Sequence, residues 1–110
     1  MKSDIISIHV HVTDETKAII NHELLEKEIK YLVNTSRGEI INENDVITAL
    51  KNKKLLGYAT DVLESEFDDI KKSKFFLPEN KKLNLILTPH VGGMTIEGQT
   101  KAYIWSINKL

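Results

Sequence analysis

Four short apolar runs, each followed by polar or ionisable residues, limit most strongly how this 110-residue chain can fold. The first run is short and rich in β-branched residues, which predicts a buried strand rather than a helix. Stretches long enough for helices or long loops separate the runs. Alternating strands and helices predict a parallel sheet of about four strands with crossover helices, and therefore an α/β fold. The predicted strands lie within residues 4–12, 31–34, 56–62 and 83–87.

The segments between the strands carry helix signals of different strength. Thr13 to Thr16 supply cap-forming oxygens and early acidic charge, which predict a helix that runs to about Lys30, with a break near Asn21 and His22. Three further segments are expected to connect or close the sheet: a helix over 42–53, a partly helical connection over 67–82 and an amphipathic helix over 95–110.

Ionisable residues follow three of the four predicted strands. Arg37 follows the second strand, Asp61 and Glu66 follow the third. His90 follows the fourth strand within a Thr-Pro-His-Val-Gly-Gly turn. Because ligands of parallel sheets bind beyond the carboxyl ends of the strands, we expect these side chains on one rim. A guanidinium for a carboxylate, a proton-moving histidine and a carboxylate that holds it suit a 2-keto or 2-hydroxy acid.

The composition excludes several classes of function. A net charge of −1 and a pI near 6.4, with both signs mixed along the chain, provide no basic field for nucleic acid or anionic lipid. Without cysteine there is no disulfide framework, no thiolate metal site and no cysteine nucleophile. The apolar run from Ile5 to Val12 is too short to span a bilayer. We expect a cytoplasmic protein with no nucleic-acid, membrane or metal partner.

One motif expected of a complete dinucleotide-binding sheet is missing. Such sheets are commonly built from two βαβαβ halves, and the half that grips a pyrophosphate begins with a G-x-G-x-x-G turn. The five glycines of the sequence never take that spacing. The residues therefore predict half of a doubly wound sheet, without the phosphate-binding half.

Four ordered motifs carry a resemblance to a known family. They are SIHVHVTDET at residues 7–16, NTSRGEIIN at 34–42, GYATDVLESE at 57–66 and TPHVGG at 88–93. In these motifs the chain resembles the C-terminal half of the nucleotide-binding domain of the D-isomer-specific 2-hydroxyacid dehydrogenases, along nearly its whole length. Four motifs in order are specific, whereas each alone is weak. The resemblance implies a partial Rossmann-like fold over residues 1–110, with the Gly-rich half and the substrate domain absent.

The resemblance also implies a reaction, a cofactor and roles for individual residues. The reaction is hydride transfer between the nicotinamide of NAD and the C2 of a small 2-hydroxy acid or its 2-keto acid, NADP not being excluded. Arg37 would bind the substrate carboxylate and polarise the carbonyl, His90 would be the acid/base, and Glu66 would pair with His90 and keep its imidazole protonated when needed. Asp61 would contact the nicotinamide end of the cofactor, although it could also simply close a turn. Further cofactor contacts are implied for Val10, His11, Thr16, Thr35, Ser36, Arg37, His90, Gly92 and Gly93.

Two positions depart from the family pattern. The family usually has proline where this chain has His11, which puts cofactor packing in doubt. It commonly has proline after the catalytic glutamate, where this chain has Phe67, and this difference marks a subgroup. His9, within the first strand, is interpreted as a hydrogen-bonded strand histidine.

Two other functional interpretations stay open beside the dehydrogenase. The same fold and triad occur in corepressors that resemble these enzymes and use dinucleotide chiefly to assemble, so a non-catalytic module is one alternative. A truncated fragment without a function of its own is the other. The first strand would also present an unpaired edge, which favours a homo-oligomer, such as a dimer, or pairing with the missing half.

Overall fold

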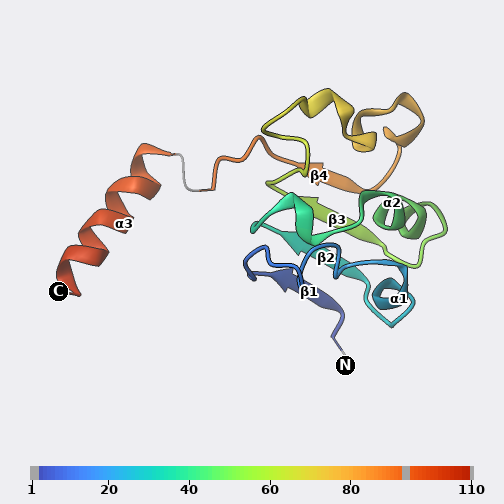
Figure 1. Cartoon of the computed structure of the whole chain (residues 1–110), viewed down its shortest axis with the longest axis horizontal. Helices are drawn as coiled ribbons and strands as arrows, with labels where there is room; N and C mark the ends of the chain where they lie inside the picture. Colours follow the sequence, from blue (N-terminus) through green and yellow to red (C-terminus); the bar gives the residue numbers. More distant parts are fainter. Residues whose placement is uncertain (1–2, 93–94, 110) are drawn as a thin grey trace.

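The computed structural model describes residues 3–92 and 95–109, and four strands of this part form one sheet (Figure 1). All three neighbouring pairs are parallel, and the strand order follows the chain. The predicted α/β fold with a four-stranded parallel sheet is therefore confirmed. The strands are β1 (Ile5–Ile8), β2 (Tyr31–Asn34), β3 (Gly57–Thr60) and β4 (Leu85–Leu87).

The register aligns the carboxyl ends of the strands. Ile8 is level with Asn34, Asn34 with Thr60, and Thr60 with Leu87. The four segments that leave the strands therefore start from one edge of the sheet. This shared edge is where residues far apart in sequence can meet.

Short helices connect the strands and cover one face of the sheet. The register puts Leu32 and Tyr58 side by side on this face, where both are buried. They belong to one apolar core with Val46 and Leu50 of the longest connecting helix. The helical elements are α1 (His22–Leu25), η1 (Gly38–Ile40), α2 (Glu43–Lys51), η2 (Ile70–Lys72), η3 (Lys74–Phe76), η4 (Pro78–Asn80) and α3 (Ile96–Asn108).

The predicted helix from Thr13 to about Lys30 is wrong over most of its length. The hydroxyls of Thr13 and Thr16 bond each other's backbone amides, so the cap-forming oxygens close a local turn. Ala18 then takes a left-handed φ of 52°, which a helix does not allow. α1 starts only after Asn21, whose side chain accepts a hydrogen bond from the Leu24 amide. The residue expected to break the helix is its N-cap.

The other predicted elements are present, β2 with the predicted bounds and the remaining strands and helices with shorter ones. Asn42 caps α2 by accepting a hydrogen bond from the Asp45 amide, as the sequence pattern indicates. The irregular connection over 67–82 contains three single-turn 3₁₀ helices and is therefore partly helical, as expected. The first strand is not the buried strand expected over 4–12, because it lies at the edge of the sheet and only Ile8 in it is buried.

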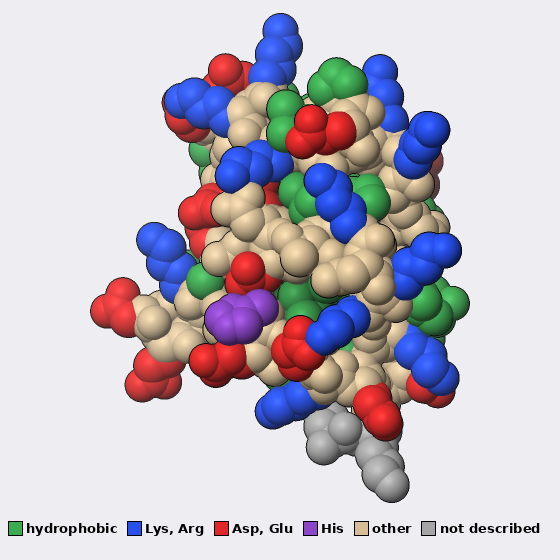
Figure 2. Space-filling view, turned by 90° about the vertical axis from the view of Figure 1, so that its right-hand side faces the viewer, with side chains coloured by type: hydrophobic (Ala, Val, Ile, Leu, Met, Phe, Trp, Pro, Cys, Tyr) green, Lys and Arg blue, Asp and Glu red, His purple; other side chains and the backbone are tan. Residues whose placement is uncertain are grey.

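The second face of the sheet and α3 both expose apolar side chains. Ile5, Tyr31 and Ile86 are exposed on the strands. α3 stands apart from the sheet in Figure 1, and Tyr103 and Ile104 on it are exposed. On the face drawn in Figure 2, charged side chains of both signs are interspersed, in keeping with the mixed charge of the sequence. No helix of the described residues is long and apolar enough to cross a membrane.

Candidate active site

A buried asparagine shapes the loop that follows β2. Asn34 is fully buried, its Oδ1 accepts a hydrogen bond from the Ser36 amide at 3.0 Å, and its Nδ2 donates to the Arg37 carbonyl at 2.9 Å. The Ser36 hydroxyl donates to the carbonyl of Val10 in the neighbouring loop. The guanidinium of Arg37 is exposed and donates to its neighbour, the Ser36 carbonyl, at 2.7 Å. Arg37 therefore lies on the expected rim with donors still available to a ligand.

Gly38 brings this loop into contact with the loop after β3. A Cβ on Gly38 would lie 2.0 Å from both the Glu64 amide nitrogen and the Leu63 carbonyl carbon. Both neighbours are backbone atoms, so they cannot rotate out of the way. Only glycine allows this approach, which fixes the segment that carries Arg37 against the segment that leads to Glu66.

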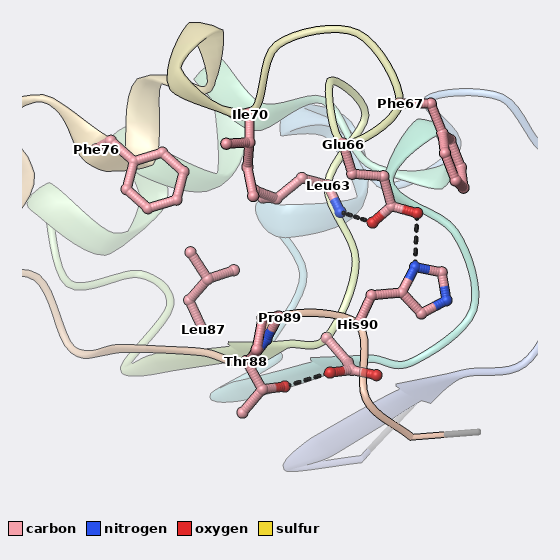
Figure 3. A pocket seen from close by; sticks show the side chains of 10 residues that line it. Leu63, Glu66, Phe67, Ile70, Phe76, Leu87, Thr88, Pro89 and His90 are labelled. Atoms are coloured by element: carbon pink, nitrogen blue, oxygen red, sulfur yellow. Dashed lines mark hydrogen bonds and ion pairs between the residues drawn. The ribbon is translucent and has the colours of Figure 1, made fainter. Parts of the chain in front are cut away.

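His90 and Glu66 form a hydrogen-bonded ion pair when the imidazole is protonated (Figure 3). The His90 Nδ1 lies 2.7 Å from Glu66 Oε1. Because an ionised carboxylate can only accept, Nδ1 carries the proton in this contact, and Nε2 is the ring nitrogen left for a ligand. The other carboxylate oxygen, Glu66 Oε2, accepts a hydrogen bond from the Leu63 amide at 3.0 Å. The Glu66 side chain is 10% exposed and the His90 side chain is 38% exposed. The carboxylate is therefore the buried member of the pair, and the imidazole is the member that solvent or a ligand can reach.

Asp61 closes the turn that carries His90. Its Oδ1 accepts hydrogen bonds from the Thr88 hydroxyl and from the Val91 amide, the latter at 3.0 Å. Its Oδ2 accepts a hydrogen bond from the Gly92 amide at 2.9 Å. Burial tends to raise the pKa of this carboxyl, but the three hydrogen bonds outweigh burial, so the pKa of Asp61 lies below its usual value.

An apolar pocket of about 370 Å³ adjoins the catalytic candidates. In Figure 3, Ile70, Phe76 and Leu87 group at one end of it, and Glu66 and His90 lie at the other. The Phe67 ring stands edge-on to the His90 ring with the two centroids 6.4 Å apart. The pocket is lined by Asp61, Leu63, Glu66, Phe67, Ile70, Phe76, Leu87, Thr88, Pro89 and His90.

A second, more polar pocket of about 490 Å³ lies at the ends of β1 and β2. It contains Arg37, Thr35 and Ser36 together with His9 and His11, which follow β1. The chemistry of this lining, with hydroxyls, imidazoles and a guanidinium, fits the ribose and phosphate oxygens of a dinucleotide. Its lining residues are His9, His11, Val12, Thr35, Ser36 and Arg37.

The expected rim is thus divided between two pockets. Asp61, Glu66 and His90 come together, whereas Arg37 lines the neighbouring pocket with His11. Three other predicted cofactor contacts lie in the same loops. Val10 accepts from Ser36, Thr16 donates to the His11 carbonyl at 2.6 Å, and Gly92 is bonded to Asp61. Gly93 lies outside the described residues.

Four residues that shape the site were not singled out from the sequence. Asn34 carries a recognisable signal, because a polar residue that ends an apolar strand and is buried must bond its own loop. Gly38 follows Arg37 in a turn, which signals a close backbone approach but not its partner. Leu63 acts through its amide and Thr88 through its hydroxyl, for which the sequence gives no specific signal.

No group of three or more histidine, aspartate or glutamate side chains in the described residues could hold a metal ion.

The fold and the rim define the class of protein to which this chain belongs. The four-stranded parallel sheet with its connecting helices is a portion of a Rossmann-like NAD-binding domain. The family model described as "D-isomer specific 2-hydroxyacid dehydrogenase, NAD binding domain" matches residues 1–92. The chain belongs to this family, which confirms the resemblance of its four motifs.

Individual relatives match most of this chain but only part of their own length. A glyoxylate reductase from Thermofilum pendens is 41% identical over 106 residues, covering 91% of this chain and 29% of the relative. A hydroxypyruvate reductase from Thermotoga maritima is 34% identical over 113 residues, covering 99% of this chain and 35% of the relative. The solved NAD complex of a formate dehydrogenase from Staphylococcus aureus superimposes with a TM-score of 0.74 at 34% identity, covering 90% of this chain and 29% of that chain.

Proposed function

We propose that this chain is the C-terminal half of the dinucleotide-binding domain of an NAD-dependent D-2-hydroxyacid dehydrogenase, and that it carries the acid/base and the substrate anchor. The observation that carries the proposal is the 2.7 Å contact between His90 and Glu66 at the carboxyl-end rim of the sheet. Family membership supports the reaction class, and the relatives' names, glyoxylate reductase and hydroxypyruvate reductase, support a small 2-keto acid as substrate.

His90 moves the proton of the reaction. Its Nδ1 is committed to Glu66, so Nε2 gives a proton to the carbonyl oxygen of the 2-keto acid or takes one from the 2-hydroxy acid. The Glu66 carboxylate stabilises the imidazolium form that precedes reduction. The Leu63 amide donates a hydrogen bond to Glu66 and already restricts this side chain. Pairing with the imidazole therefore costs little further side-chain entropy.

Arg37 anchors the substrate. Its planar guanidinium can grip a carboxylate at two points and orient the adjacent carbonyl. Its exposure on the rim and its single local contact to the Ser36 carbonyl leave donors for that grip.

The polar pocket at the ends of β1 and β2 is the part of this chain that fits the cofactor. Thr35, Ser36 and His11 would contact its ribose and nicotinamide ring region there. The cofactor, when bound, would supply the hydride in its reduced form, NADH, and would accept it as NAD. The cofactor's pyrophosphate requires a glycine turn that these 110 residues do not contain.

Turnover by the complete protein tests this proposal. Oxidation of NADH with glyoxylate, pyruvate, hydroxypyruvate and branched 2-keto acids should be measured for the wild type and for His90→Gln. We expect turnover of at least one keto acid and a loss of about 10²- to 10⁴-fold in kcat in the variant, with cofactor binding retained. Nucleotide-dependent assembly without any turnover would instead favour a non-catalytic module.

A further inference from the structure

The backbone around His90 is held in an unfavourable conformation. His90 has a φ of 56°, in the left-handed region that residues with a side chain seldom adopt. Within the turn its amide donates only to the Thr88 carbonyl, at 3.0 Å. A turn with this backbone persists where its surroundings hold it on both sides.

Asp61 supplies the hold on both sides of His90. Its carboxylate accepts hydrogen bonds from the hydroxyl of Thr88, two residues before His90, and from the amides of Val91 and Gly92, the two residues after it. The turn is also anchored to β3, where the Thr88 amide donates to the Thr60 carbonyl at 3.0 Å. Gly92 allows the close approach, because a Cβ there would lie 3.1 Å from Asp61 Oδ2.

We propose that Asp61 is a positioning residue that holds the His90 imidazole against Glu66 by clasping the 88–92 turn at three points. Its importance for catalysis rests on the proposed function, whereas the clasp itself does not. Asp61 is 9% exposed, and its hydrogen bonds go to the turn that carries His90 and not to the imidazole itself.

The clasp requires a carboxylate rather than any polar side chain. Two oxygens that only accept can serve a hydroxyl and two amides at once. In Asp61→Asn one oxygen becomes an NH₂ donor, which would face either the Gly92 amide or the Thr88 hydroxyl and the Val91 amide. At least one of the three contacts is lost, and the buried donor is left without a partner.

Nuclear magnetic resonance of the 110-residue chain tests the clasp without requiring activity. The readout is the His90 Nδ1–H proton, which the bond to Glu66 shields from exchange with water and which Glu66→Gln assigns. We expect this resonance in the wild type and in Thr88→Ser, which keeps the hydroxyl. It should disappear into solvent exchange in Asp61→Asn and weaken in Thr88→Val, which keeps the shape but removes the donor.

The methyl resonances of Leu32 and Val46, which are buried in the apolar core, show whether each variant is folded. If Asp61→Asn does not fold, the comparison of Thr88→Val with Thr88→Ser tests the clasp. An unchanged Nδ1–H proton in folded Asp61→Asn, or equal spectra for Thr88→Val and Thr88→Ser, would overturn the positioning role. Such a result leaves the dehydrogenase proposal intact, since turnover by the complete protein tests that separately.

Discussion

The His90 imidazole meets the Glu66 carboxylate at 2.7 Å although 24 positions separate the two residues in the sequence. Glu66 follows β3 and His90 follows β4, and the parallel register brings both segments to the same edge of the sheet. The contact therefore depends on the sheet and not on local sequence.

Removing the charge of Glu66 should slow keto-acid reduction. In Glu66→Gln a neutral amide replaces the carboxylate, so the imidazolium loses a charge-assisted hydrogen bond of about 1.5–3 kcal/mol. We expect kcat of the complete enzyme to fall by about 10- to 100-fold. Glu64→Gln is the matched control, because Glu64 is exposed and has no hydrogen bond among the described contacts. Equal kcat values in the two variants would contradict a role for Glu66.

Arg37→Lys should lower catalytic efficiency although the charge is kept. An ammonium cannot reproduce the planar two-point grip on a carboxylate, and the expected loss in kcat/KM is on the order of 2–4 kcal/mol by analogy with losing charge-assisted contacts. Steady-state kinetics with a 2-keto acid and with its amide separate anchoring from other effects. In the variant, kcat/KM for the 2-keto acid should no longer exceed kcat/KM for its amide. A preserved advantage would remove Arg37 from the anchor.

Gly38→Ala should destabilise the fold. The new methyl would lie 2.0 Å from backbone atoms of Leu63 and Glu64, so one loop must move. We expect a loss of about 1–3 kcal/mol in the free energy of unfolding, measured in urea. Gly98→Ala in the exposed α3 is the control and should change stability by less, because its Cβ would lie 2.8 Å from the Thr95 hydroxyl, a side-chain end that can rotate, and 3.8 Å from the Gly92 carbonyl oxygen. Similar losses in both variants would mean that the loop contact is not tight.

Two carboxyls should give opposite pH dependences of stability. The pKa of Asp61 is lowered by its hydrogen bonds despite burial, so the folded state holds fewer protons there than the unfolded state. Its contribution is present above the unfolded value near 3.9 and is lost as pH falls through the lower folded value. Asp61→Asn should therefore be less stable than wild type at pH 7, and the gap should narrow in acid. A gap independent of pH would contradict the lowered pKa.

Glu43 provides the contrast. Burial raises the pKa of Glu43, and the hydrogen bonds from Ser73 and the Lys74 amide offset this only in part. The folded state therefore holds more protons at Glu43 than the unfolded state, so the contribution of this carboxyl to stability is present below the unfolded pKa and is lost as pH rises through the raised folded pKa. Glu43→Gln should compare more favourably with wild type at pH 7 than at pH 4. Thermal unfolding of both proteins across that range measures the difference.

Local pattern was sufficient for the sheet but not for the first helix or for the supports of the site. β2 was predicted well because a short apolar run ends at the polar Asn34. Thr13 and Thr16 misled the helix prediction, because the same hydroxyls that cap a helix can close a turn. For Asp61 the sequence left two roles open, a contact to the cofactor and the closure of a turn. It could not decide between them, since two of the partners of Asp61 are backbone amides that β4 brings near. Such contacts have no signature in a single sequence.

The last prediction concerns the 110-residue chain on its own, which should bind NAD weakly, turn over no 2-hydroxy acid and self-associate. Binding should be weak because no glycine turn is present to receive the pyrophosphate. Association is expected because β1 forms one edge of the sheet and Ile5, on that strand, is 61% exposed. Ile5→Lys places a charge on this edge and should shift the chain toward monomer in sedimentation, whereas Thr48→Lys on the exposed surface of α2 should not. Calorimetric titration with NAD checks the binding, and micromolar affinity in a monomer would show that these residues suffice as a dinucleotide-binding module.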